Sequence, residues 1–146
     1  MITIRQANRA DDKTIRKLIY QYRLNPIGID WRRFRVAVDA KDRVIGCGQV
    51  KPHGDGTREL ASIVVQQQYR KQGIGRAIIQ RLLEENPGVL YLTTRETMGP
   101  YYEQFGFYRL LPEKLPPYFR RIWTIVSIAR RIFPLRQQLL VMRRDP

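Results

Sequence analysis

The segment that decides the fold is Glu59-Leu-Ala-Ser-Ile-Val-Val-Gln-Gln-Gln-Tyr-Arg-Lys-Gln-Gly-Ile-Gly-Arg76. Its apolar first half predicts a buried strand, and its end begins an amphipathic helix that opens at Gly73. The turn between the two is polar, basic and interrupted by glycines. A helix that starts directly after such a turn presents backbone amides and the positive end of its dipole. We therefore expect this turn to bind a phosphate or a pyrophosphate.

The residue types in the turn support this interpretation. Three basic side chains add positive charge: Arg70, Lys71 and Arg76. Glycine has no side chain, so Gly73 and Gly75 allow an oxygen-rich ligand to approach the backbone closely. The glycine spacing matches neither Gly-x-x-x-x-Gly-Lys-Ser/Thr, the phosphate loop of nucleotide hydrolases, nor the dinucleotide motif Gly-x-Gly-x-x-Gly. Both of those classes are therefore excluded.

The hydrophobic pattern on both sides of this segment predicts one mixed sheet. Before it, an amphipathic helix is followed by strand patterns joined by short turns, which predicts an antiparallel meander. After it come a strand-helix-strand unit and a final strand. The predicted strands are 2–5, 33–39, 44–51, 59–65, 89–93, 107–111 and 139–143, and the predicted helices end near residues 23, 33, 86 and 105. We expect an α/β (mixed α+β) fold, with a central sheet of about six or seven strands flanked by helices, in a single domain over residues 1–146.

The composition is that of a globular domain with an excess of positive charge. The 146 residues are 43% hydrophobic and carry 27 Lys and Arg against 13 Asp and Glu, a net charge of +14. Such a surface attracts polyanions, although surface charge is often simply solvated. The one cysteine, Cys47, excludes an internal disulfide framework. The sequence shows no signal peptide and no apolar run long enough to span a membrane, so we expect a cytoplasmic protein.

Two motifs together resemble the GCN5-related N-acetyltransferase (GNAT) family. Arg70-Lys-Gln-Gly-Ile-Gly75 is similar to the family's Arg/Gln-x-x-Gly-x-Gly/Ala signature, and it follows an apolar strand as the family signature does. Further along the chain, Tyr101-Tyr-Glu-Gln-Phe-Gly-Phe107 resembles the family's Tyr-Glu-x-x-Gly-Phe element. The similarity extends from about Ile2 to Phe107 and returns at the last predicted strand.

The resemblance implies a GNAT fold with acetyl-coenzyme A as cosubstrate. In the family the strand backbone binds the pantetheine arm like an added strand, and the loop holds the pyrophosphate. The matching residues are Ile63, Val64 and Val65 of the strand, and Arg70, Lys71, Gln72, Gly73, Ile74, Gly75 and Arg76 of the loop. The implied reaction is N-acetyl transfer to a primary amine of a small molecule or peptide, by direct attack of the amine on the thioester. A backbone amide of the strand would stabilise the oxyanion. Many members carry an asparagine after the fifth strand. This chain has no asparagine there, and Thr94 or Thr97 would have to take its place.

Acyl transfer needs a base for the amine and gains from an acid for the departing thiolate. Glu59 is our base candidate, because family members often place a glutamate at a matching point; the alternative is a solvated glutamate or the partner of an arginine. Glu96 and Glu103 are competing candidates. Tyr102 takes the position of the family's tyrosine near the thioester sulfur and is our acid candidate. Tyr101 is the competing assignment, and both tyrosines could instead be core residues.

The other reactive side chains suit structural roles. The single histidine, His53, lies in the turn Pro52-His-Gly-Asp-Gly56, where a histidine is usually solvated. Cys47 falls in a predicted strand and is either a small core residue or faces the site. No spacing of histidines, cysteines and carboxylates matches a metal site, so we expect no metal.

A segment at about residues 112–138 departs from the family, which usually joins its last two strands by a short loop. It contains a proline-rich start and a basic, very apolar helix from Phe119 to Phe133 that Pro134 ends. Three interpretations stay open: an extra core helix or dimer contact, a cover over the acceptor site, and contact with an anionic membrane through residues 117–133. Apolar residues wrap most of the helix, which favours burial in protein over the membrane.

Two other functions stay open besides the enzyme. One is a non-catalytic acetyl-coenzyme A-binding or sensor protein of the same fold. The other is a nucleic-acid-binding module driven by the charge, although the sequence carries no recognition-helix, zinc or aromatic RNA-binding motif. The expected partners are acetyl-coenzyme A and an amine acceptor that the sequence does not identify. A homodimer is an open alternative.

Overall fold

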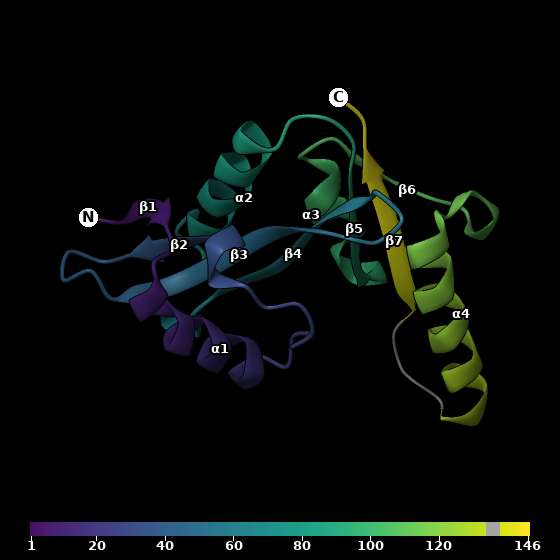
Figure 1. Cartoon of the computed structure of the whole chain (residues 1–146), viewed down its shortest axis with the longest axis horizontal. Helices are drawn as coiled ribbons and strands as arrows, with labels where there is room; N and C mark the ends of the chain where they lie inside the picture. Colours follow the sequence, from purple (N-terminus) through teal and green to yellow (C-terminus); the bar gives the residue numbers. More distant parts are fainter. Residues whose placement is uncertain (134–137) are drawn as a thin grey trace. The chain divides into compact units, whose positions relative to one another are not determined.

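A computed structural model describes residues 1–133 and 138–146, and the strands of this part form one seven-stranded sheet. The strands are β1 (Thr3–Gln6), β2 (Phe34–Val38), β3 (Val44–Pro52), β4 (Arg58–Val65), β5 (Leu90–Arg95), β6 (Phe107–Arg109) and β7 (Leu139–Arg144). Their order across the sheet is β1-β2-β3-β4-β5-β7-β6 (Figure 1). β4 and β5 run parallel, whereas β1–β2, β2–β3, β5–β7 and β6–β7 are antiparallel. The predicted mixed sheet is therefore confirmed.

The α-helices of the described chain are α1 (Asp12–Gln21), α2 (Ile74–Glu85), α3 (Gly99–Glu103) and α4 (Pro117–Ile132). The third is shorter than its pattern predicts, because the amides of Phe105 and Gly106 turn back to carbonyls only three residues earlier. Gly106 has φ +90°, a conformation that ends a helix readily at glycine. β6 also ends two residues before the predicted Leu111, where Pro112 follows without an amide donor.

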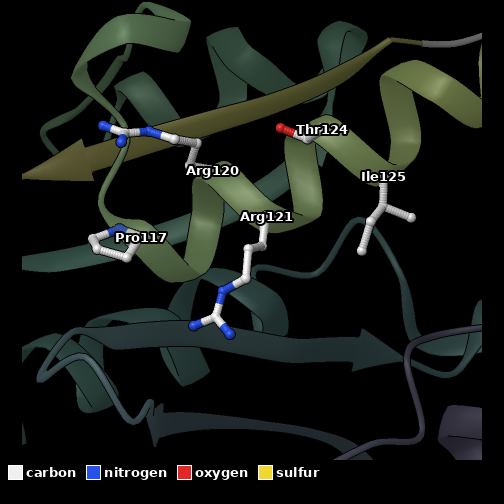
Figure 2. A pocket seen from close by; sticks show the side chains of 5 residues that line it. All are labelled: Pro117, Arg120, Arg121, Thr124 and Ile125. Atoms are coloured by element: carbon white, nitrogen blue, oxygen red, sulfur yellow. The ribbon is translucent and has the colours of Figure 1, made fainter.

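The helix predicted in the inserted segment is α4. It buries Phe119 completely but leaves a row of isoleucines exposed: Ile125, Ile128 and Ile132. Figure 2 shows Arg121 and Ile125 leaving α4 on the same side. The helix ends at Ile132, and the helix stop predicted at Pro134 lies outside the described residues.

The chain divides into two compact units. The first contains Met1–Lys51 and Leu60–Pro87, and the second contains Pro52–Glu59 and Gly88–Pro146. β4 begins in the second unit and continues into the first. The two units are described separately below, and a single domain over residues 1–146 stays a prediction.

In the first unit, α1 and α2 pack on opposite faces of the strands. Side chains alternate between the two faces of a strand, so neighbouring positions of β3 meet different helices. Cys47 belongs to the cluster that includes Ile15 of α1 and Val36 of β2. Gly48, the next residue, faces α2, where Ile78 lies close above it. The amphipathic patterns of both helices thus bury their apolar faces against one set of strands.

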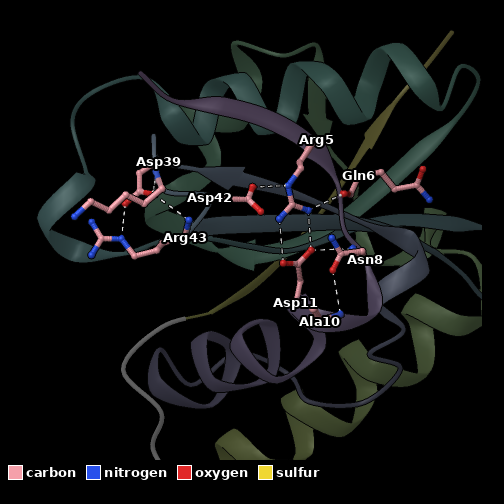
Figure 3. Close-up of polar contacts among 9 residues, drawn as sticks. Arg5, Gln6, Asn8, Ala10, Asp11, Asp39, Asp42 and Arg43 are labelled. Carbon is pink, nitrogen blue, oxygen red and sulfur yellow. Dashed lines mark hydrogen bonds and ion pairs between the residues drawn. The ribbon is translucent and has the colours of Figure 1, made fainter.

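Arg5 joins the edge strand β1 to two turns of the first unit (Figure 3). Its guanidinium donates two hydrogen bonds to Asp11, at 2.8 and 3.1 Å, and its Nε donates to Asp42 at 3.1 Å. Asp11 also accepts from the amide of Asn8 at 2.8 Å, just before α1. Burial would raise the pKa of Asp11, but Arg5 and this amide together lower it. The start of α1 is therefore held to the sheet by an ionised carboxylate.

Gly48 supplies the space that α2 needs to approach β3. A Cβ atom there would lie 2.5 Å from Ile63 Cδ1, 2.9 Å from Ile78 Cγ2 and 3.1 Å from a methyl of Leu82. We expect Gly48→Ala to lower the free energy of unfolding by about 1–3 kcal/mol, because these side chains must shift to admit a methyl group. Gly54→Ala is the matched control, since its Cβ would meet no atom within 4 Å. Equal urea midpoints for the two variants would contradict this account of the packing.

Candidate functional site

The predicted anion-binding turn lies in the first unit, between β4 and α2. Lys71 and Gly73 both adopt left-handed backbone conformations, with φ +65° and +77°. Alternation of left-handed residues turns successive amides toward one side and forms a concavity that binds anions. Within the described residues, no side chain caps α2 and its first turn holds no acidic residue. The turn is exposed, and a Cβ at Gly73 would meet nothing within 4 Å, so a ligand can reach these amides.

Arg70 stabilises the turn as well as adding charge to it. Its Nε donates to the carbonyl of Val65 at 3.1 Å, and its guanidinium lies 5.0 Å from the ring centroid of Tyr22. The hydroxyl of Tyr22 accepts a hydrogen bond from the amide of Gln67 at 2.9 Å. The turn is therefore braced against α1 and the end of β4. Lys71, Gln72 and Arg76 are exposed around it.

Ser62, within β4, has an unusual backbone conformation. Its φ of +60° is rare for a residue with a side chain and changes the direction of the backbone groups that follow it. Gln49 of β3 donates to Ser62 Oγ at 2.9 Å. Gln49 Oε1 is buried and has no hydrogen-bond partner among the described residues. After Ser62, Val64 is buried, whereas Ile63 and Val65 are half-buried.

Cys47 is a core residue of the first unit. It is fully buried beside the carbonyl of Ser62, to which its Sγ donates at 3.7 Å. Burial raises the pKa of the Cys47 thiol to about 12. The thiolate that would attack a thioester is thus scarce at neutral pH. Of the two placements left open by the sequence, the core placement is the one observed.

The second unit brings Glu59 and His53 together. Glu59 Oε1 lies 2.7 Å from His53 Nε2, and Glu59 Oε2 accepts from Thr93 Oγ1 at 3.3 Å. Glu59 is only 6% exposed, and it stands opposite Tyr91 where β4 pairs with β5. The side chain is therefore neither a solvated glutamate nor the partner of an arginine, the two alternatives to a catalytic role. It is a buried carboxylate with a histidine and a threonine as its partners.

The expectation that His53 is solvated is wrong. Its ring stacks on Tyr118 of α4 with centroids 3.5 Å apart, and the edge of Phe119 lies 5.7 Å away. The turn that carries His53 closes through a hydrogen bond from its amide to the carbonyl of Thr57 at 2.9 Å. The sequence around His53 does not predict this burial, because Tyr118 and Phe119, which cover the ring, lie more than sixty residues further along the chain.

The tyrosines of α3 pack as an aromatic cluster in the second unit. The rings of Tyr101 and Tyr102 are 5.2 Å apart, and Tyr102 meets Phe107 edge-on at 6.3 Å. Burial, with a smaller effect of Tyr101, raises the pKa of Tyr102 to about 12. Tyr102 therefore keeps its proton throughout the neutral range and can donate a hydrogen bond.

The two carboxylates that compete with Glu59 for the role of base form ion pairs at the surface. Glu96 and Glu103 both form ion pairs with Arg109, and their side chains are about half exposed. Thr97, one of the two substitutes for the missing asparagine, is exposed, and Thr94 is half-buried. Of the three candidate bases, only Glu59 is enclosed by other groups, as a proton acceptor shielded from bulk water must be.

The first turn of α4 is anchored beside this pair. The amide of Tyr118 donates to Asp55 Oδ2 at 3.0 Å, and Phe119 stacks on Tyr91 with centroids 5.1 Å apart. The same turns of α4 line a pocket of about 450 Å³ (Figure 2). The pocket is lined by Pro117, Arg120, Arg121, Thr124 and Ile125. The inserted segment thus packs within its own unit through Phe119, while Ile125, Ile128 and Ile132 stay exposed.

A mixed sheet with a glycine-containing turn between a central strand and a helix is the arrangement of the acyl-coenzyme A N-acyltransferase fold. The acetyltransferase (GNAT) domain matches residues 30–109, more than half of the chain. The chain therefore belongs to the GNAT family, as the two sequence motifs predict. Comparison with curated protein sequences gives no significant match.

Solved structures share the fold at low sequence identity. N-acetylglutamate synthase from Neisseria gonorrhoeae, complexed with coenzyme A and N-acetyl-glutamate, has TM-score 0.74 and 17% identity over 99% of this chain, which spans only 35% of that protein. Rv2747 from Mycobacterium tuberculosis, in complex with coenzyme A and NLQ, has TM-score 0.72 and 18% identity over 99% of both chains. The ribosomal-protein-S18-alanine N-acetyltransferase from Escherichia coli has TM-score 0.66 and 16% identity, covering 99% of this chain and 94% of that one. At these identities the likeness concerns the fold alone.

The described residues contain neither a membrane-spanning helix nor a metal-binding cluster. Within 1–133 and 138–146, every helix is too short or too polar to cross a bilayer. The same residues bring no three histidines, cysteines or carboxylates together in a way that would hold a metal ion.

Asp55 ties the His53 turn to the start of α4. Burial would raise its pKa, but hydrogen bonds from Thr57 and the Tyr118 amide lower it. We expect Asp55→Ala to lower the free energy of unfolding by about 1 kcal/mol, the usual effect of losing a helix cap, and Asp55→Asn to lower it less. Because the folded-state pKa is lowered, the contribution is complete above about pH 4 and is lost as the pH falls through the lowered pKa. Chemical denaturation of the three proteins at pH 7 and pH 3 checks this, and a difference that persists undiminished at pH 3 would contradict it.

Proposed function

We propose that this chain is an N-acetyltransferase that transfers the acetyl group of acetyl-coenzyme A to a primary amine. The observation that carries the proposal is the exposed turn before α2, where Lys71 and Gly73 are left-handed and no acidic side chain occupies the helix start. Such a site suits a diphosphate, which coenzyme A carries. Membership of the GNAT family and the coenzyme A in two of the similar solved structures support the same ligand.

The proposed binding mode uses backbone groups of the first unit. The diphosphate accepts hydrogen bonds from amides of the turn, while Lys71 and Arg76 supply charge from exposed positions. The pantetheine arm lies along the strand residues Ile63, Val64 and Val65, paired as an added strand would be. The left-handed conformation of Ser62 precedes this stretch, and in this proposal an amide of the stretch stabilises the oxyanion of the tetrahedral intermediate.

In the proposed reaction, Glu59 is the base. The amine nitrogen attacks the thioester carbonyl carbon, the carbon–sulfur bond breaks, and coenzyme A leaves as the thiolate. The proton lost by the amine goes to the carboxylate of Glu59. His53, at 2.7 Å from that carboxylate, fixes its orientation and provides a second nitrogen through which the proton can pass outward. His53 is therefore a positioning residue in this proposal, and the amine contacts Glu59.

Tyr102 is proposed to donate a hydrogen bond to the leaving sulfur. A thiol like that of coenzyme A has a pKa of about 8.5, whereas burial raises that of Tyr102 to about 12. Complete proton transfer across this difference would cost about 5 kcal/mol. Donation without transfer avoids this cost and still stabilises the developing charge. The phenol thus acts as a hydrogen-bond donor, and the thiolate takes its proton from solvent after release.

The contribution of the turn before α2 to acetyl-coenzyme A binding can be measured. We expect Lys71→Gln to weaken acetyl-coenzyme A binding about three- to tenfold, because one charge near the diphosphate is lost. Binding of S-acetylpantetheine, which lacks the diphosphate, should not change. Lys41→Gln, a change in an exposed turn of the same unit, is the control. Isothermal titration calorimetry decides, and absence of acetyl-coenzyme A binding by the unchanged protein would refute the proposed function.

The proposed roles of Glu59 as base and Tyr102 as hydrogen-bond donor can be tested separately from ligand binding. We expect Glu59→Gln to lower kcat about 10²- to 10⁴-fold, and Tyr102→Phe to lower it about tenfold, with acetyl-coenzyme A affinity unchanged. Glu103→Gln, at the surface pair with Arg109, should keep full activity. Thiol release with a panel of amines measures all of these. Full activity of Glu59→Gln would move the base elsewhere, and ligand binding without turnover on any amine would indicate a non-catalytic acetyl-coenzyme A-binding protein.

A further inference from the structure

Two side chains, Tyr118 and His53, connect the turn of α4 that lines the pocket to the proposed base. Tyr118 stacks on His53, which contacts Glu59, and its helix neighbour Pro117 lines the pocket. Burial, then Glu59 and Asp55, raise the pKa of Tyr118, and the charge of Arg121, one turn further along, lowers it. The pocket, the histidine and the carboxylate are thus parts of one continuous set of contacts in the second unit.

The pocket carries positive charge without a matching carboxylate. Arg120 donates to the carbonyl of Leu115 at 3.1 Å, which holds its stem. In the described part of the chain, no carboxylate forms an ion pair with Arg121, whose side chain is exposed. The sequence from Lys114 to Arg144 contains no acidic residue at all. A guanidinium presents parallel donors that match the two oxygens of a carboxylate or a phosphate.

The same side of α4 is apolar beyond the arginine. Ile125 completes the pocket and is 66% exposed, and Ile128 and Ile132 continue the row at 51% and 67% exposure. Residues spaced by three and four lie along one face of a helix. A ligand held by Arg121 can therefore bury an apolar portion against this row. A second copy of the chain is a poor occupant, because it would bring the same positive charges to the contact.

We propose that this pocket binds the acceptor, and that the acceptor is a primary amine carrying an anionic group beside an apolar portion. The inference rests on the proposed acetyl transfer and adds the substrate class. Arg121 holds the anionic group, Ile125 contacts the apolar portion, and Glu59 takes the proton from the amine. The donor set suits a carboxylate or a phosphonate equally, so both are used as probes.

The test compares acceptors that differ only in the anionic group. L-leucine, its phosphonate analogue, leucinamide and 3-methylbutylamine are each offered with acetyl-coenzyme A to the unchanged protein, to Arg121→Gln and to Arg131→Gln. Arg131 lies on the same helix outside the pocket and is the matched control. We expect Arg121→Gln to raise KM about tenfold for whichever anionic acceptors are used, and to leave KM for the two analogues without an anionic group and for acetyl-coenzyme A within about twofold. Arg131→Gln should change neither.

Product binding supplies a second readout that does not need turnover. N-acetylleucine should bind the coenzyme A-loaded protein more tightly than N-acetylleucinamide, and Arg121→Gln should remove the difference. Equal binding of the two products, or turnover of the amines without an anionic group as fast as that of the anionic ones, overturns the inference while acetyl transfer stands. Loss of acetyl-coenzyme A binding would instead refute the proposed function itself. Sedimentation with phosphatidylglycerol vesicles that Arg121→Gln abolishes, without any effect on acceptors, would assign this face to a membrane and overturn the inference.

Discussion

The contact between Glu59 and His53 organises the second unit. A carboxylate removed from water is destabilised by several kcal/mol unless donors surround it. Glu59 finds two such groups, His53 Nε2 and Thr93 Oγ1, and neither belongs to the regular part of its own strand. The first requires the turn before β4 to fold back, and the second requires β5 to lie parallel beside Glu59. One buried charge therefore constrains both a turn and a strand register.

The same turn also determines where α4 begins. Asp55 accepts from the amide of Tyr118, and the ring of Tyr118 then covers His53. A carboxylate at a helix N-terminus interacts favourably with the helix dipole. The histidine, its cover and the helix start are thus coupled through a few residues of one turn. This coupling explains why a segment that departs from the family pattern contributes directly to the proposed base.

The features that sequence predicts well here are local ones. The strand, turn and helix around Gly73 follow from consecutive residue types, because glycine tolerates the left-handed backbone that the turn needs. The role of His53 could not be read in this way, since its partners come from β4 and α4. Arg70 is an intermediate case: its charge near a phosphate follows from the sequence, whereas its bond to the carbonyl of Val65 depends on the folded turn. The ion pairs that argue against Glu96 and Glu103 as the base likewise depend on the fold, because they form only when β6 brings Arg109 close to both carboxylates.

The charge around α4 bears on the chemistry as well as on binding. A protonated amine that approaches Arg121 is disfavoured by like-charge repulsion, which lowers the pKa of the amine and favours loss of its proton. That effect helps the reaction, because only the neutral amine attacks, but by itself it also weakens binding of the acceptor. An anionic group on the acceptor removes the conflict, since its attraction to Arg121 offsets the repulsion of the ammonium. Cys47 offers no alternative route, because the thiol is buried with its pKa near 12. The proposed direct attack and the proposed anionic acceptor are therefore consistent with each other, because the negative charge that helps the acceptor bind also offsets the repulsion of its ammonium group.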